Sequence, residues 1–233
     1  MIEYKNQTFR KLYDRGGALC LENMRFERCM FENCAISLTK DVGLRSTVRN
    51  VSVENCAANG CGIGPAIFEN VEVDGLATND LLIVWAATFC HVKLSGDIGK
   101  IKINSSAHFV DRTEATQGPF TRSREALYRS IDWALDITEA RFKGFDVNGI
   151  PARLFRRDPE SQAVVTRDRV TAEGGQRITE AKSNPWMPWV RAALDEGSSD
   201  GILVTPLGAP KKKRDEFLQG LRQLRELGIV EPE

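Results

Sequence analysis

Apolar residues recur at steps of two and three along the first two thirds of the chain, in units of five residues. Cut from Leu19, the chain reads LCLEN, MRFER, CMFEN and CAISL; eight more units run from Ser46 to Trp85 and four from Leu135 to Leu154. Of the 32 first and middle positions in these sixteen units, 30 are hydrophobic. Side chains two residues apart lie on one face of a strand, so the pattern predicts short strands that share one core.

The last position of each unit follows a different rule. Asn and Gly adopt left-handed and turn conformations at low cost, so a unit that ends in either residue predicts a corner of the chain. Four such corners would close a square coil. Nine of the sixteen units end this way, at Asn23, Asn33, Asn50, Asn55, Gly60, Asn70, Gly75, Gly144 and Gly149.

Every fourth unit departs from the corner rule. The units CAISL, CGIGP, LLIVW and IPARL lack the Asn or Gly ending. The extra residues Thr39–Arg45 and Ala86 follow directly after such a unit. One corner of each coil is therefore predicted to be the place where additional chain leaves it.

This slower period selects between two registers. Sliding the coils by one unit would place Cys34 over Cys56. The favoured register instead stacks like residues, namely Ile36 with Ile63 and Ile83, Cys29 with Cys56, and Cys34 with Cys61.

The pattern is damaged but continues between Ala87 and Ser105, which we interpret as a fourth coil before a fifth at 135–154. Residues 19–154 are thus predicted to form a parallel quadrilateral β-helix of about five coils in a mainly β protein. The alternatives are a parallel β-helix with longer coils and an antiparallel sandwich. The predicted core columns contain Leu21, Phe26, Phe31, Ile36, Val48, Val53, Ile63, Phe68, Val73, Ile83, Phe89, Leu94, Ile103, Ile137, Phe142 and Val147.

These units resemble those of the pentapeptide-repeat family. Each unit of that family has, in order, a small or apolar residue, a residue that is often Asp or Asn, a Leu or Phe, and two polar residues. The unit ARFKG (140–144) fits well, whereas only Asp136 and Asp146 match the usual second position. The resemblance implies a right-handed quadrilateral β-helix. Some family members imitate DNA and bind type II topoisomerases, which requires a strongly negative face. Residues 19–85 hold nine acidic and five basic residues, and residues 86–154 hold eight and ten, so the negative charge is mild.

The segments outside the repeats are assigned as follows. Residues 1–18 are expected to cap one end of the β-helix, because an open last coil exposes unpaired backbone. Residues 119–134 predict an inserted helix with Ser123 as N-cap, and Leu127, Ile131 and Ala134 on one face. Residues 155–233 form a C-terminal extension of α or α+β type.

Within this extension, residues 163–172 predict a strand or hairpin, 201–207 a buried strand, and 211–227 an amphipathic helix that ends before Gly228. A shorter helix is predicted near Pro188. The extension is expected to cover the last coil, to form a separate domain, or to make a homodimer contact. The candidate partner-contact residues are Trp186, Trp189, Lys211, Lys212, Lys213 and Arg214.

The residues that carry chemistry form no recognisable constellation. The inward cysteines are spaced by four residues within each pair, unlike a zinc site, and are interpreted as buried small hydrophobes. His91 has no partner at recognisable spacing, and His108 has only Asp111 near it in sequence. We therefore expect no catalytic residue, no cofactor and no metal.

Composition limits the cellular compartments and the classes of partner that the sequence favours. The 32 Lys+Arg residues balance 32 Asp+Glu residues, which makes nucleic-acid binding an unfavoured prediction. No apolar run is long enough to span a membrane, and the first residues lack a secretory apolar stretch. Six cysteines then indicate reduced thiols and a cytoplasmic location.

The sequence favours a non-enzymatic scaffold that binds another protein, of the kind that confers immunity to, or antagonises, a bacterial toxin or enzyme. Three alternatives remain: a DNA-mimicking protein that interacts with topoisomerase, a nucleic-acid-binding protein acting through residues 155–233, and a carbohydrate-active β-helix enzyme.

Overall fold

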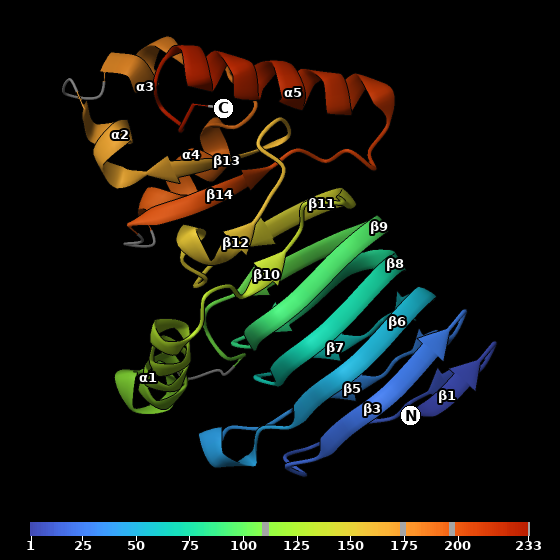
Figure 1. The fold of residues 1–233 in the computed structure, drawn as a ribbon. Coiled ribbons are helices and arrows are strands. Elements are labelled where there is room, and N and C mark those ends of the chain that lie inside the picture. Colours follow the sequence, from blue (N-terminus) through green and yellow to red (C-terminus); the bar gives the residue numbers. More distant parts are fainter. Residues whose placement is uncertain (109–111, 173–175, 196–198, 233) are drawn as a thin grey trace.

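The computed structural model describes residues 1–108, 112–172, 176–195 and 199–232. Residues 2–156 contain a twelve-stranded sheet in which all strand pairings are parallel, and Figure 1 shows its strands stacked from the N-terminal end upward. The main path runs through β1 (Ile2–Lys5), β3 (Cys20–Glu27), β6 (Thr47–Asn59), β8 (Ile67–Trp85), β9 (Thr88–Asn104), β10 (Leu135–Asp136) and β12 (Phe155–Arg156). Five strands pair beside this path: β2 (Thr8–Arg10), β4 (Met30–Glu32), β5 (Ala35–Ile36), β7 (Gly62–Ile63) and β11 (Ala140–Val147).

Successive passes of the chain place equivalent positions of the repeat over one another. Leu21 pairs with Val48, Val48 with Phe68, and Phe68 with Phe89, whose ring stacks on that of Phe68 at 5.5 Å. A second column is formed in the same way by Phe26, Val53, Val73 and Leu94. The apolar steps of two and three therefore place these side chains in one continuous core.

The corners of the sheet are residues with positive φ. Asn50 and Asn70 have φ of 52°, and His91 has φ of 56° at the equivalent place in the next pass. The asparagines also form a ladder, since Asn70 Nδ2 donates to Asn50 Oδ1 and Asn50 Nδ2 donates to Asn23 Oδ1, both at 3.4 Å. Asparagine thus serves twice at this corner, by tolerating the left-handed backbone and by bonding to the adjacent pass.

We expect Asn50→Ala to lower the free energy of unfolding by about 1–2 kcal/mol, because alanine is strained at positive φ and breaks the ladder on both sides. Asn50→Gly should cost less, since glycine relieves the backbone strain but not the lost hydrogen bonds. Urea denaturation of both variants measures the difference. A glycine variant less stable than the alanine variant would contradict the role assigned to the left-handed corner.

The prediction for the isoleucine column is confirmed for Ile36 over Ile63 and wrong for Ile83. Ile63 pairs with Val84, not with Ile83. Leu82 and Val84 are buried, whereas Ile83 is half-buried and lies at the alternate, outward position of the strand.

The slip has a local cause. The pairing of β8 with β9 shifts between Leu76 and Leu81, so the extra residue of this pass lies before Leu81 and not at Ala86. Asn79 marks the irregularity: its Oδ1 accepts from the backbone N of Gly60 at 3.3 Å and from its own neighbour, Asp80 N, at 2.9 Å. A one-residue shift moves every following side chain to the other face.

The favoured cysteine register is confirmed. The backbone N of Cys29 donates to Cys56 Sγ at 3.3 Å, and Gly62 N, directly after Cys61, donates to Cys34 O at 3.0 Å. The rival pairing of Cys34 with Cys56 is therefore wrong.

Residues 1–18, expected to be a cap, continue the sheet instead. β1 pairs with β3, which sets Ile2 beside Met24 and Tyr4 beside Phe26. β2 pairs with β4, which sets Phe9 beside Phe31. The sheet therefore begins one pass earlier than Leu19.

The block 135–154 is displaced by one side of the coil from its predicted place. Leu135 pairs with Val92 on one side and with Phe155 on the other, so IPARL begins a further pass instead of closing the fifth. The side of the coil above Phe89 therefore has no strand from this block and is covered by the helix that precedes Leu135. Phe89 N donates to the hydroxyl of Tyr128 in that helix at 3.4 Å, and Tyr128 is buried in the sheet core.

That helix, α1 (Glu114–Ser130), begins five residues earlier than predicted and ends before Ala134. Its N-cap residue is Thr113, and Pro119 lies inside it. Ser123 is not the N-cap but lies within the helix, where its Oγ accepts from Arg45 Nη2 at 2.8 Å. The most buried side chains on α1 are Phe120, Arg124 and Tyr128, whereas the predicted Leu127 and Ile131 are only partly buried.

The C-terminal extension has its own core. Its elements are β13 (Gln162–Thr166), α2 (Arg167–Thr171), α3 (Gln176–Glu180), α4 (Met187–Asp195), β14 (Asp200–Val204) and α5 (Lys211–Glu226). β13 and β14 pair in the antiparallel sense. Phe217, Leu221 and Leu224 of α5 are buried, as the predicted stripe requires, and Gly228 follows with φ of 66°.

This extension covers the last pass of the sheet (Figure 1). Gln162 Nε2 donates to Ile137 O at 2.9 Å, and Gly208 N donates to Phe142 O at 2.8 Å. Val204 of β14 is part of the same core as the sheet. The two ends of the sheet thus differ: one is covered by residues of the C-terminal extension and the other is the first pass, 1–18.

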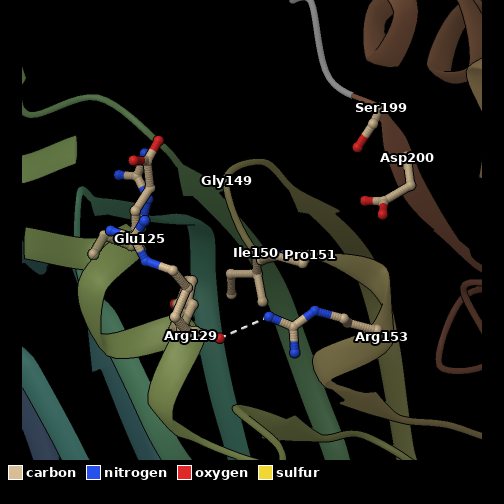
Figure 2. A pocket seen from close by; sticks show the side chains of 10 residues that line it. Glu125, Arg129, Gly149, Ile150, Pro151, Arg153, Ser199 and Asp200 are labelled. Atoms are coloured by element: carbon tan, nitrogen blue, oxygen red, sulfur yellow. Dashed lines mark hydrogen bonds between the residues drawn. The ribbon is translucent and has the colours of Figure 1, made fainter. Parts of the chain in front are cut away.

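A pocket of about 400 Å³ lies where the extension meets the sheet, between α1, residues 149–153 and the start of β14 (Figure 2). Among the described helices, none has both the length and the apolar character required to cross a membrane.

Candidate functional site

Large exposed hydrophobic side chains are concentrated in the N-terminal part of the chain. Eight of the ten in the described chain belong to residues 1–44, namely Met1, Ile2, Leu12, Tyr13, Leu19, Met30, Leu38 and Leu44. Isolated exposed hydrophobic residues are normal on a protein surface, but a group at one end marks a candidate interface. We call Ile2, Tyr4, Phe9 and Leu12 the N-terminal apolar end.

These four residues occupy the positions that point into the core in every later pass. Ile2 lies beside Met24 and Tyr4 beside Phe26, both of which pack against the sheet core. Ile2 and Leu12 are nevertheless 52% and 56% exposed. Their exposure follows from their place in the first pass, where apolar side chains meet a neighbouring pass on one side only.

The aromatic rings show the same one-sided packing. Tyr4 stacks on Phe26 with centroids 5.1 Å apart, and Phe9 stacks on Phe31 at 5.3 Å. Tyr4 and Phe9 meet edge to face at 5.5 Å. Both remain half-buried, so the ring faces turned away from the second pass are available to another apolar surface.

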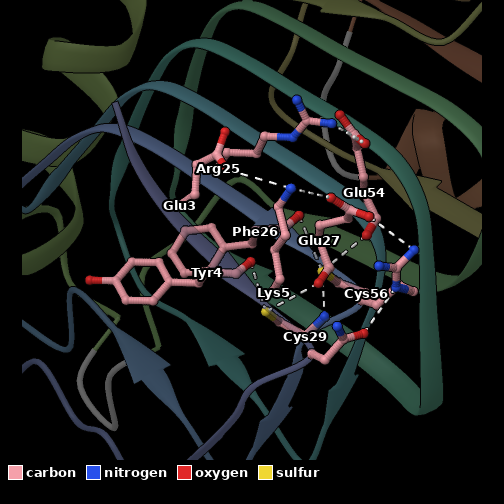
Figure 3. Close-up of polar contacts among 11 residues, drawn as sticks. Glu3, Tyr4, Lys5, Arg25, Phe26, Glu27, Cys29, Glu54 and Cys56 are labelled. Atoms are coloured by element: carbon pink, nitrogen blue, oxygen red, sulfur yellow. Dashed lines mark hydrogen bonds and ion pairs between the residues drawn. The ribbon is translucent and has the colours of Figure 1, made fainter.

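Ion pairs surround one side of this end (Figure 3). Lys5 Nζ lies 3.5 Å from Glu3 and 3.3 Å from Glu27, while Arg25 pairs with Glu54 at 2.9 Å. The hydrogen bond from Lys5 lowers the pKa of Glu27 below its usual value. These charges compensate one another at the surface, which leaves the apolar residues as the distinctive feature. An apolar centre with a polar rim is typical of a protein interface.

Among the described residues, no strand pairs with the outer side of the first pass. β1 pairs with β3 and β2 pairs with β4, and the sheet order of the described strands ends at β1. An edge strand carries free N–H and C=O groups that can pair with a strand from another chain. This end therefore offers both apolar side chains and backbone hydrogen-bonding groups.

Trp186, predicted as a partner contact, is a core residue. It is buried, its Nε1 donates to Phe217 O at 2.9 Å, and its ring meets that of Phe217 edge to face at 4.7 Å. The prediction was wrong because α5, far along the chain, packs over it. Trp189 packs on the same ring from outside and is 38% exposed.

The predicted basic run lies at the start of α5, in the extension and away from the N-terminal apolar end. Lys211, Lys212 and Lys213 are exposed. Lys213 lies over the Phe217 ring at 5.7 Å, and Arg214 pairs with the neighbouring Asp215 at 3.4 Å. The structure does not join these residues to the candidate site.

The cysteines and histidines form no metal group in the described residues. All six cysteines are free, and burial raises the pKa of the Cys56 and Cys61 thiols. His91 Nε2 lies 2.7 Å from Asp132 Oδ1, and its ring meets that of Trp133 at 4.8 Å. His108 stacks on Trp85; Asp111, its expected neighbour, lies outside the described residues.

Sequence reasoning missed the candidate site, although a signal was present. Residues 2–16 divide into IEYKN, QTFRK and LYDRG, with Ile2, Tyr4, Phe9 and Leu12 at the positions of the repeat. Two polar residues at such positions, Gln7 and Asp14, break the pattern. Comparison with protein-family models, curated proteins and solved structures returned no match for this chain.

Proposed function

We propose that this protein is a non-enzymatic scaffold that binds a protein partner through its N-terminal apolar end. In this proposal the parallel sheet is a right-handed quadrilateral β-helix of the pentapeptide-repeat type. Four observations support that geometry: parallel pairing throughout, left-handed residues at the corners, repeated core columns, and a five-residue period. Six free cysteines suit a reducing compartment, the cytoplasm.

The main support for this function is the contrast between the two ends of the sheet. The last pass is covered by the C-terminal extension, whereas the core positions of the first pass are half-exposed or exposed. Burying one such side chain contributes about 1.5–3 kcal/mol. A partner that covers Ile2 and Leu12 would gain this energy without any change in the fold.

The free edge of the first pass defines the kind of partner. A strand added to β1 would form backbone hydrogen bonds, while its apolar side chains would meet Tyr4 and Phe9. The partner is therefore a protein with an extended apolar segment. This role suits a scaffold that binds a bacterial toxin or enzyme and holds it inactive.

The double variant Ile2→Arg/Leu12→Arg tests the site. Charged side chains at the centre of an apolar interface should weaken partner capture by about a hundredfold, whereas the partly exposed edge position limits their effect on folding. The tagged full-length chain is used to capture partners from the native host. Bound proteins are identified by mass spectrometry, and the affinity of the captured partner is measured by titration.

Leu81→Arg is the matched control, because Leu81 is 45% exposed on a different pass. It should leave capture unchanged. Sedimentation of the purified protein is measured in parallel. Recovery of the chain alone, with no partner in any host extract, would count against the proposal, as would equal losses in the double variant and in Leu81→Arg.

A further inference from the structure

The pocket between α1, residues 149–153 and β14 combines three guanidinium groups with two carboxylates (Figure 2). In Figure 2, Glu125 and Arg129 lie on one side, Ser199 and Asp200 on the other, and the turn from Gly149 to Pro151 between them. The pocket is lined by Arg124, Glu125, Tyr128, Arg129, Gly149, Ile150, Pro151, Arg153, Ser199 and Asp200.

Arg124 is the unusual member of this group. Its side chain is buried, with only 7% of the residue exposed, and it lines the pocket. One of its nitrogens, Nη1, donates to the backbone O of Ser105. No described carboxylate lies within ion-pair distance of it. Burial lowers its pKa below the usual arginine value, and the charge of the neighbouring Glu125 opposes that shift only in part. A buried guanidinium without an anionic partner is costly, because much of its hydration is lost.

The other charged groups of the pocket do not remove this excess. Arg153 Nη2 donates to Tyr128 O at 2.7 Å, which holds its guanidinium beside α1. Asp200 Oδ1 accepts from the backbone N of Ala152 at 3.2 Å. With Arg129, three positive side chains meet the two carboxylates of Glu125 and Asp200, so the pocket has a net positive charge.

Gly149 shapes the wall next to Arg124. It has φ of 84°, and an added Cβ would lie 2.6 Å from Ser105 Cβ and 3.4 Å from Arg124 Cζ. Glycine therefore allows the turn to pass directly over the guanidinium. The turn shields this group from solvent, which increases the strength of any interaction with an anion.

We infer that this pocket binds a small molecule that carries a phosphate group. Guanidinium groups donate paired hydrogen bonds that match the geometry of phosphate oxygens, and Arg124 and Arg153 approach the pocket from two separate elements. The anion would supply the negative counter-charge that the Arg124 guanidinium lacks. The inference is independent of the partner proposed for the N-terminal apolar end.

Inorganic phosphate is the probe, and the full chain is used. Thermal unfolding should shift upward with rising phosphate at constant ionic strength, because a ligand of the folded state stabilises it. Arg153→Gln, at an exposed residue, should weaken phosphate binding by roughly tenfold, and Arg124→Met should abolish the shift. Arg122→Gln is the control, since Arg122 lies on the same helix but pairs with Glu114 outside the pocket.

Loss of the phosphate shift in Arg153→Gln and Arg124→Met, with the shift retained in Arg122→Gln, supports the site. Arg153→Gln keeps the test decisive if Arg124→Met fails to fold. A wild-type chain with no phosphate-dependent shift would overturn the inference. An unchanged shift in Arg153→Gln would also overturn it.

Discussion

Phe142→Ala is expected to lower the free energy of unfolding by about 3–5 kcal/mol. The Phe142 side chain is fully buried, pairs with Ile98 in the preceding pass, and packs on the Phe145 ring at 4.4 Å. The C-terminal extension covers it, since Gly208 N donates to its backbone O. A cavity at this place cannot be filled from solvent or by a free chain end. Urea denaturation with tryptophan fluorescence measures the loss.

Two comparisons show whether position along the sheet controls the cost. Phe31→Ala, at an equivalent repeat position near the exposed end, should cost clearly less because Phe31 is only half-buried. Lys143→Ala, at an exposed residue beside Phe142, should change stability by less than about 0.5 kcal/mol. Equal costs for Phe142→Ala and Phe31→Ala would show that the two ends of the sheet are equally covered, contrary to the structure.

Trp186→Ala is expected to destabilise the C-terminal extension by about 3–5 kcal/mol. The substitution removes a buried ring packed on Phe217 and the hydrogen bond that its Nε1 donates to the Phe217 carbonyl. Val190 and Leu221 belong to the same fully buried core, which leaves little freedom for repacking. Limited proteolysis of the full chain, followed by identification of the cut sites, measures local opening between residues 162 and 230.

Trp189→Ala provides the contrast. Trp189 is more exposed, and its removal should cost about 1 kcal/mol, near the average for single substitutions. If Trp186→Ala left stability unchanged and weakened partner capture, the residue would be a contact as the sequence had predicted, and the packing described here would be wrong.

The repeat was predictable wherever the apolar positions are separated by polar ones. Phe26 stands between Arg25 and Glu27, and Phe31 and Phe68 are each followed by Glu and Asn. Phe26 and Phe68 pack against the sheet core, and Phe31 packs on Phe26. Periodicity fails where that contrast is absent. Residues 81–85 read LLIVW, so either phase puts apolar side chains inward, and one inserted residue moved Ile83 outward.

Other errors had two causes, namely a helix start that carries no apolar pattern and contacts between segments far apart in the sequence. The first turn of α1 is polar, so the apolar pattern marked only its later part and Pro119 was taken as its start. The burial of Trp186 depends on α5, whose Phe217 lies 31 residues further along the chain and packs across it. The phosphate pocket combines three segments that no local pattern connects. The N-terminal apolar end was missed although its own repeat positions mark it, because Gln7 and Asp14 interrupt the pattern.

The corner that carries the insertions has a practical consequence for protein engineering. Leu21 pairs with Val48 although residues 39–45 lie between their passes as added chain. The added loop rests against α1, where Val42 packs near Phe120. Gly43 at its tip is exposed. A foreign peptide grafted at Gly43 would thus be displayed beside a helix without disturbing strand alignment, making this corner a natural position for an epitope or a reporter tag.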